Sequence, residues 1–410
     1  MDYIHKIYYK NKEIHDETYN KRINFESTFK TGIKIQAKKS VMDLYYIPNI
    51  KTDNKIEKIR INDNKLKDLE ANLPPIIGES LLIEAISSEL QSSNELEGVE
   101  SNKEDIVYST RKILSKKDDR SERFSSTINS YILLIDNKLD FPKDSYEVRK
   151  IYDKITDGEI SNDDLPDGKI FRKNDVHINK MGTVSGQTIH KGMVGEDNII
   201  KSIDQLLDFI NNSKIPLLIK VAIGHYYIEY IHPFYDGNGR LGRFISSIYL
   251  ESTFSYLTAL SLSRGSYLQK ANYYKAFDVT NSEKNKGELN FFIDVFLDLL
   301  IKGQEEMIEN LIDKNEKFDE LINSIENDTN LSEEIDKTTL IGFLPNALLL
   351  FNQPISRDEI IDSMSLERYP VTQIKSSLNR LVKLGYLKMT KKRPLYYVVN
   401  DEFILDGELK

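Results

Sequence analysis

The stretch His232-Pro-Phe-Tyr-Asp-Gly-Asn-Gly-Arg-Leu-Gly-Arg243 decides how the rest of the sequence is interpreted. It joins an imidazole, a carboxylate, a glycine-rich turn and two arginines in one short segment. Residues 215–231, just before it, carry apolar side chains at helical spacing. Pro233 cannot continue a helix, because its ring fixes φ and it has no amide hydrogen. We therefore expect His232 at the end of a helix, followed by a turn.

The turn is expected to gather backbone amides around an anion. Gly237, Asn238 and Gly239 tolerate positive φ, so successive N–H groups can face one ligand. Residues 244–250 are apolar enough for a second helix that starts near Asn238. The positive end of that helix dipole would point at the same anion.

Charged side chains flank this turn. Arg240 and Arg243 are three residues apart, on one face of the second helix, and could clamp two phosphates. Asp236 offers the hard oxygen ligand that Mg²⁺ prefers. A lone histidine after a helix is usually a cap, and a lone Gly-Asn-Gly is usually only a turn. In this order, however, the residues predict a site for a metal-bound polyphosphate.

The segment also resembles the signature of the Fic family, His-Pro-Phe-x-Asp/Glu-Gly-Asn-Gly-Arg-x-x-Arg, and every specified position matches. The resemblance implies transfer of AMP from ATP to a hydroxyl of a target protein. His232 would be the general base and Asp236 the Mg²⁺ ligand. The resemblance assigns ATP binding to residues of the turn and of the helix start, with the last arginine meeting the γ-phosphate: Gly237, Asn238, Gly239, Arg240, Gly242 and Arg243.

Length and composition exclude some classes of protein. The chain has 410 residues, enough for two or three domains, and a formal net charge of −9, so the whole protein has no basic footprint for nucleic acid. It has no cysteine, which excludes disulfides and thiolate metal sites. We find no signal peptide and no apolar run long enough for a membrane helix, and we expect a cytoplasmic protein.

The expected fold is mainly α, with three parts. Residues 1–72 are interpreted as an N-terminal extension, with a short strand at 33–37 and a charged, loop-rich stretch at 49–64. Residues 73–326 would form the Fic helical core. Residues 327–410 would form a separate C-terminal domain.

Residues 80–98 are expected to form an amphipathic helix that ends at Gly98. The ordinary interpretation of its end is a glycine cap with acidic residues in water. However, Ser93-x-x-x-Glu97-Gly98 matches the inhibitory motif of Fic proteins whose inhibitory helix precedes the core. By this resemblance Glu97 would pair with Arg243 and take the place of the γ-phosphate, which would keep ATP from binding productively.

A β-hairpin is expected at about 170–190, around the turn at Lys180-Met-Gly182. In the Fic family a hairpin flap here docks the backbone of the target by strand addition; the alternative is an ordinary surface hairpin. His177 and His190 flank the hairpin, but without a third ligand at useful spacing they are interpreted as facing solvent. His225 is expected to be a packed or hydrogen-bonding partner rather than a second base.

Tyr273 and Tyr274 lie on another expected helix. Paired tyrosines usually only pack, but the family places such a pair beside the nucleotide, so one of the two could line the adenine site.

Residues 327–410 resemble a winged helix, with helices at 338–351, 357–363 and 371–384 and strands at 387–389 and 396–399. This fold commonly binds DNA, and it also docks proteins. Positive charge is concentrated in its second half, at Lys375, Arg380, Lys383, Lys388, Lys391, Lys392 and Arg393.

The function that we expect is therefore an adenylyltransferase with ATP and Mg²⁺, a target protein and an inhibitory Glu97. Gly239 argues against a kinase-like relative, which carries lysine there. Three alternative functions stay open: transfer from another donor, removal of AMP, and an ATP-sensing DNA-binding regulator. So does a homodimer, since Fic cores often self-associate.

Overall fold

The computed structural model describes residues 2–37, 40–73, 77–115, 123–179, 188–366 and 369–405. The chain forms two compact units: residues 1–67, 88–101 and 113–307 make the first, and residues 68–87, 102–112 and 308–410 make the second. Helices predominate in the described parts, and the strands form small antiparallel sheets. The expectation of a mainly α fold is confirmed.

Two buried helices, α9 (Leu217–Ile231) and α10 (Asn238–Glu251), form the centre of the first unit. Helix α9 begins after Pro216 and ends at His232, which has the left-handed φ of 51°. Helix α10 begins after Gly237, whose φ of 77° is easy for glycine and costly for other residues. The sequence therefore predicted both helices and the break between them correctly.

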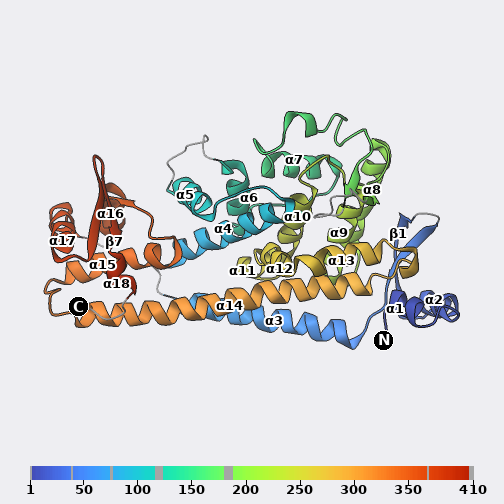
Figure 1. The fold of residues 1–410 in the computed structure, drawn as a ribbon, viewed down its shortest axis with the longest axis horizontal. Helices are drawn as coiled ribbons and strands as arrows, with labels where there is room; N and C mark the ends of the chain where they lie inside the picture. Colours follow the sequence, from blue (N-terminus) through green and yellow to red (C-terminus); the bar gives the residue numbers. More distant parts are fainter. Residues whose placement is uncertain are drawn as a thin grey trace. The chain divides into compact units, whose positions relative to one another are not determined.

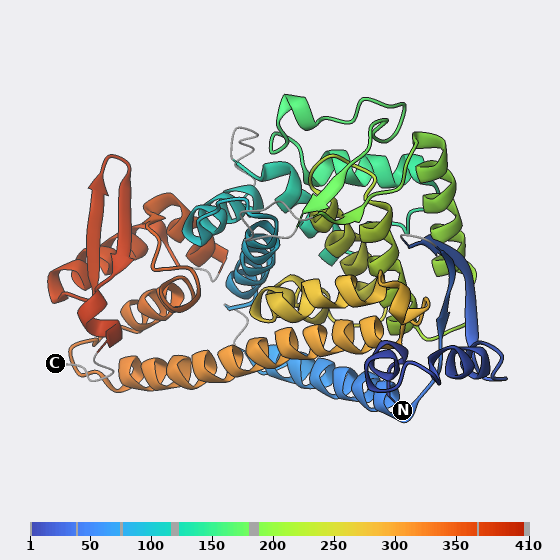
Figure 2. The ribbon, with the colours of Figure 1, turned by 45° about the vertical axis from the view of Figure 1, so that its right-hand side comes forward.

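Further helices pack around this pair (Figure 1). Helices α6, α7 and α8 contact α9 or α10 directly, and the β1–β2 hairpin lies against α8 (Figure 2). The remaining elements with residues in the first unit are α1 (Ile4–Lys10), α2 (His15–Ile23), β1 (Phe29–Gln36), β2 (Val41–Tyr46), α3 (Ile50–Ala71), α4 (Gly78–Glu97), α5 (Lys103–Leu114), α6 (Ser125–Ile135), α7 (Ser145–Ile155), η2 (Asn162–Asp164), β3 (His177–Asn179), β4 (Thr188–Lys191), α8 (Glu196–Asn212), α11 (Tyr256–Ala259), α12 (Leu262–Leu268), α13 (Lys270–Thr280), η3 (Glu283–Asn285) and α14 (Asn290–Asn327).

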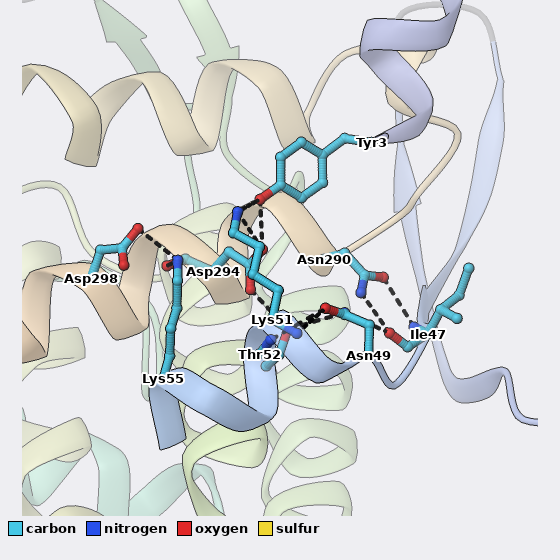
Figure 3. Close-up of polar contacts among 9 residues, drawn as sticks. All are labelled: Tyr3, Ile47, Asn49, Lys51, Thr52, Lys55, Asn290, Asp294 and Asp298. Atoms are coloured by element: carbon cyan, nitrogen blue, oxygen red, sulfur yellow. Dashed lines mark hydrogen bonds and ion pairs between the residues drawn. The ribbon is translucent and has the colours of Figure 1, made fainter. Parts of the chain in front are cut away.

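Helix α3 corrects one prediction, because residues 49–64 are not loop-rich. Asn49 caps the helix by accepting from the amides of Lys51 and Thr52 (3.1 and 3.2 Å). The Lys51 ammonium lies 3.1 Å from the buried carboxylate of Asp294, which belongs to α14. The Thr52 hydroxyl donates to the same carboxylate (Figure 3). These contacts to a helix distant in sequence fix α3, whose own residues show no clear apolar face.

The predicted hairpin is present as strands β3 and β4, which pair antiparallel. The strands are shorter than expected, and their turn at 180–187 lies outside the described residues. Helix α4 ends at Glu97 and is followed by Gly98 with φ 76°, as predicted.

The second unit contains the three helices and the hairpin that were expected near the C-terminus. Its elements are α15 (Glu334–Leu349), β5 (Ile355–Ser356), α16 (Arg357–Leu366), α17 (Val371–Leu384), β6 (Leu387–Lys392), β7 (Leu395–Val399) and α18 (Asp401–Leu405). The strand order is β5–β7–β6. Across the described residues, no helix combines the length and the apolar character that a bilayer crossing requires.

Candidate active site

The turn between α9 and α10 is held in shape by Asn238 and Phe234. The Asn238 side chain accepts from the Phe234 amide and donates to the Phe234 carbonyl, at 2.9 Å each. The Phe234 ring stacks on Tyr152 of α7 with 3.5 Å between ring centroids. The side chain of Asn238 thus shapes the turn, and its backbone amide at the start of α10 is left for an anion.

The start of α10 presents backbone amides to one place. The first intrahelical bond runs from the Leu241 amide to the Gly237 carbonyl (3.0 Å). The amides of residues 238–240 therefore have no acceptor inside the helix. They could therefore meet an anion, which is the role that the glycine pattern predicts.

Arg243 and Glu97 meet at this site, although 146 residues separate them in the chain. The Arg243 guanidinium is fully buried, and its Nη2 lies 3.2 Å from Glu97 Oε1. Its Nε donates to the Ser93 hydroxyl (3.1 Å), and Nη2 donates to the Ser93 carbonyl (2.9 Å). Burial opposes the charge, but the nearby carboxylates of Glu97 and Glu229 outweigh it, and the pKa of Arg243 is raised.

Gly239 lets the Glu97 carboxylate approach the helix start. A Cβ at position 239 would collide with Glu97 Oε1 and would lie 2.8 Å from Arg243 Nη1. The carboxylate thus lies directly on the glycine turn, where a phosphate would be expected.

Some donors at the site are not satisfied. Arg240 Nε and Arg243 Nη1 are buried and have no hydrogen-bond partner among the described residues. Arg240 Nη2 lies only 3.5 Å from Asp236 Oδ2, and the other Asp236 oxygen accepts from the Gly237 amide (2.6 Å). Buried donors normally have partners, so these two nitrogens are suited to hydrogen-bond an anion.

Residues 142–250, which include α9, the turn and α10, match the model of the Fic/DOC family. The chain contains a Fic domain. Fic-family proteins typically transfer AMP or another nucleotide group to proteins. The match lies within the predicted core and includes every signature residue.

Solved structures of Fic proteins are similar to this chain. A Fic family protein from Desulfovibrio desulfuricans G20 shares 17% identity at a TM-score of 0.51, over 89% of this chain and 98% of that one. A Fic domain-containing signaling protein from Bacteroides thetaiotaomicron VPI-5482 shares 16% identity (TM-score 0.42, 62% of this chain and 97% of that one). Fic-1 from C. elegans shares 15% (TM-score 0.40, 64% and 73%). The first likeness supports the fold.

The two tyrosines of α13 occupy different places. Tyr273 is buried, and its hydroxyl lies 2.9 Å from His225 Nε2. Tyr274 is half-buried and donates to the Leu96 carbonyl at the end of α4 (2.8 Å). The half-buried ring of Tyr274 is therefore the better placed of the two to meet a ligand beside Glu97.

His225 agrees with its interpretation as a packed partner. It is buried, and burial together with the charge of Arg243 lowers its pKa to about 3. A neutral imidazole fixed by Tyr273 and by the Ser246 hydroxyl (3.2 Å) supports the core. The side chains of His177 and His190 lie outside what the structure describes.

Three functional candidates were missed by sequence reasoning. Glu89 and Glu229 are buried acids beside the site, and burial raises their pKa values to about 7 and about 8. Arg172 is buried beside His232. Glu229 is the only acid on α9, which is mostly apolar, and this is a signal that could have been used. For the other two, only the folded contacts reveal the environment.

Proposed function

We propose that this protein transfers AMP from ATP to a Ser, Thr or Tyr hydroxyl of a target protein, and that Glu97 keeps it inactive. The proposal rests on one observation, the Glu97 carboxylate placed on Gly239 and paired with Arg243. A carboxylate on a guanidinium resembles a phosphate oxygen in charge and geometry. Glu97 and the γ-phosphate of ATP would therefore compete for the same donors.

The donor set fits a triphosphate. The amides at the start of α10 and the unsatisfied nitrogens of Arg240 and Arg243 all lie around one turn. They supply directed hydrogen bonds and two positive charges, which a polyphosphate requires. The half-buried Tyr274 ring is the candidate partner for adenine.

Asp236 would hold the metal. Its side chain is 42% exposed, and a single carboxylate suits Mg²⁺, which keeps several waters and binds phosphate oxygens as well. Among the described residues, no cluster of three or more acidic or histidine side chains offers a complete protein metal site. When bound, Mg²⁺ would neutralise part of the charge on the phosphates.

His232 would act as the general base. In the proposed reaction it takes the proton of the target hydroxyl, whose oxygen attacks the α-phosphorus in line. The bond from that phosphorus to the bridging oxygen breaks, and pyrophosphate leaves. Catalysis comes mainly from positioning and charge stabilisation, with the proton transfer adding a smaller factor.

The test is labelling of the protein with α-labelled ATP and Mg²⁺. We expect wild type to label slowly and Glu97→Ala to label faster by roughly ten- to hundred-fold, because a charge-assisted hydrogen bond contributes about 1.5–3 kcal/mol. The matched control is Glu95→Ala on the same helix, which should label like wild type because its side chain bonds Gln91 instead.

Adding His232→Ala to Glu97→Ala should abolish labelling while ATP binding persists. Full labelling without His232 would refute the base. If Glu97→Ala is labelled by α-labelled UTP but not by α-labelled ATP, the nucleotide donor is UTP rather than ATP. No labelling with any nucleotide would refute the transferase proposal.

We propose DNA binding by the second unit as a second candidate function. On α17 the side chains of Gln373, Lys375 and Asn379 are exposed, and Lys391 and Arg393 are exposed on the β6–β7 hairpin. Polar and basic groups on one helix and an adjacent hairpin suit the grooves and phosphates of a duplex. Arg380, which was counted with the basic groups, instead pairs with Asp336 and Glu333 (2.8 and 2.7 Å).

Binding of the full-length protein to a random duplex, measured by fluorescence anisotropy, tests this candidate. Affinity should fall steeply between 50 and 200 mM salt, by roughly 10³-fold for about six phosphate contacts. An absence of binding at low salt would leave a protein-docking role.

A further inference from the structure

Arg172 is among the largest fully buried side chains of the protein, and the proposed reaction does not use it. Its guanidinium donates to four backbone carbonyls. Nε donates to the His232 carbonyl (2.8 Å) and Nη1 to that of Asn174 (2.6 Å). Nη2 donates to the carbonyls of Met193 (2.8 Å) and Ile231 (3.4 Å). All three nitrogens of the guanidinium are therefore engaged.

Two of these carbonyls belong to the end of α9. The last carbonyls of a helix have no partner inside it, and the negative end of its dipole favours a cation. His232 adopts φ 51°, which costs about 1–3 kcal/mol for a residue other than glycine. The Arg172 amide also donates to the Pro233 carbonyl (3.2 Å). Arg172 thus holds the backbone of His232 in a conformation that it would not adopt unaided.

The other two carbonyls belong to the two ends of the hairpin. Asn174 precedes β3, and Met193 follows β4. The Met193 amide in turn donates to the Ile231 carbonyl (3.0 Å). One side chain therefore ties both ends of the predicted flap to the residue that carries the proposed base.

The segment that carries Arg172 is itself fixed. The Glu196 carboxylate accepts from the amides of Ile170 (2.7 Å) and Phe171 (3.0 Å). The Asp167 carboxylate accepts from the Lys173 amide (2.9 Å). The backbone on both sides of Arg172 is therefore held in place by hydrogen bonds.

We infer that Arg172 is a positioning residue, which fixes His232 and both ends of the β3–β4 hairpin in one arrangement. The inference rests on the proposed transfer reaction. The base must meet the acceptor hydroxyl, and the hairpin is expected to present that hydroxyl. A shared anchor fixes the distance between the two, whereas ATP is held by the turn and α10.

The experiment compares Arg172→Lys with Arg149→Lys, both in the active Glu97→Ala background. Lysine keeps the charge but cannot reach carbonyls in three directions. We expect kcat of self-labelling to fall by roughly 10²-fold, the usual scale for a misplacement of about 1 Å, with KM for ATP unchanged. Arg149 donates to one backbone carbonyl, that of Ile170 (2.7 Å), and a lysine ammonium can still make this single bond, so Arg149→Lys should leave both constants as they are.

Gly192→Ala provides a second variant in case Arg172→Lys does not fold. A Cβ at position 192 would lie 2.6 Å from Arg172 Nη2 and 3.2 Å from His232 Cβ, so it displaces the guanidinium without removing a charge. We expect kcat to fall here as well, but by less than in Arg172→Lys. An unchanged kcat in both variants, or an equal rise in KM for ATP, would overturn the inference.

Amide hydrogen exchange separates this inference from the transferase proposal. Arg172→Lys and Gly192→Ala should speed exchange at the amides of His232 and Met193, while the amides of α8 keep their rates. This result is expected even if no nucleotide labels the protein. Unchanged exchange at His232 and Met193 would refute the positioning role by itself.

Discussion

Glu89 lies on the same face of α4 as Ser93 and Glu97, at intervals of four residues. Its buried carboxylate accepts from the Ser263 amide (3.1 Å), the Ser263 hydroxyl (2.5 Å) and the Tyr131 hydroxyl (3.4 Å). Burial raises its pKa from 4.5 to about 7, although these bonds and the charge of Arg243 oppose the shift. The proposed inhibitory helix is therefore anchored through an acid that titrates near neutral pH.

This raised pKa predicts a pH dependence of stability. An acid whose pKa is higher in the folded state binds its proton more tightly there, so its stabilising effect is complete below pH 4.5 and is lost as pH rises through about 7. The contribution of Glu89 to the free energy of unfolding falls by about 3 kcal/mol at most. The free energy of unfolding of wild type should therefore fall relative to that of Glu89→Gln over this range.

Chemical denaturation at several pH values between 5 and 8 measures the effect. Glu95→Gln serves as the control and should follow wild type. Parallel curves for wild type and Glu89→Gln would mean that Glu89 titrates normally in the fold.

At this scale the sequence predicted the residues of one continuous segment and its one short partner motif. His232 lies at the end of α9 and Arg243 on α10, as the pattern predicted, and Glu97 pairs with Arg243, whereas the roles of these residues stay a prediction. Arg172 was not predicted, because its partners lie in segments far apart in the chain and are all backbone carbonyls. No pattern of side chains marks such a site.

Among the elements, α13 contributes to the docking of α4. The Tyr274 hydroxyl and the Lys270 ammonium donate to the last carbonyls of α4, those of Leu96 (2.8 Å) and Glu95 (3.3 Å). Donors at this end satisfy carbonyls that the helix leaves without partners. The end of α4 that carries Glu97 is thus held from the side of the proposed nucleotide site.

Tyr274→Phe should release part of the inhibition. It removes one hydrogen bond, about 0.5–1.5 kcal/mol, and keeps the ring, so self-labelling should rise roughly two- to ten-fold with KM for ATP unchanged. The initial rate of labelling is the measurement, with Tyr267→Phe on α12 as the control. A slower rate would show instead that the hydroxyl serves ATP.

Helices whose apolar residues recur at a clear helical spacing were predicted from the sequence. A helix that is fixed by contacts to residues far away in the chain was not. Helices α9 and α10 match their expected limits to within a few residues. Helix α3 was mistaken for loop because its surface is charged on most sides. Its place depends on α14, where Lys55 meets Asp298 at 2.7 Å (Figure 3).

At the scale of the whole molecule, charge is unevenly distributed. The chain carries a net charge of −9, yet the charged residues that are exposed on α17 and the β6–β7 hairpin are all basic. Acidic side chains of the same unit are used internally, as in the pair of Asp336 with Arg380. The acidic total therefore does not describe this surface.

Lys375→Gln should weaken binding of the full-length protein to duplexes of any sequence by a similar factor. It should also reduce the slope of log affinity against log salt by about 1 if the lysine contacts one phosphate. Lys317→Gln on α14 is a control with the same change of charge. Equal slopes for the two variants would remove α17 from the proposed DNA surface.

The contact between the Glu97 carboxylate and Gly239 limits which residues can replace this glycine. Any side chain at position 239 would occupy the space that this carboxylate takes. A lineage that acquired a larger residue there could no longer seat the glutamate, and selection to keep it would cease. Among relatives we therefore expect the two positions to change together, so that an aligned set of sequences would identify which members have lost the proposed inhibition.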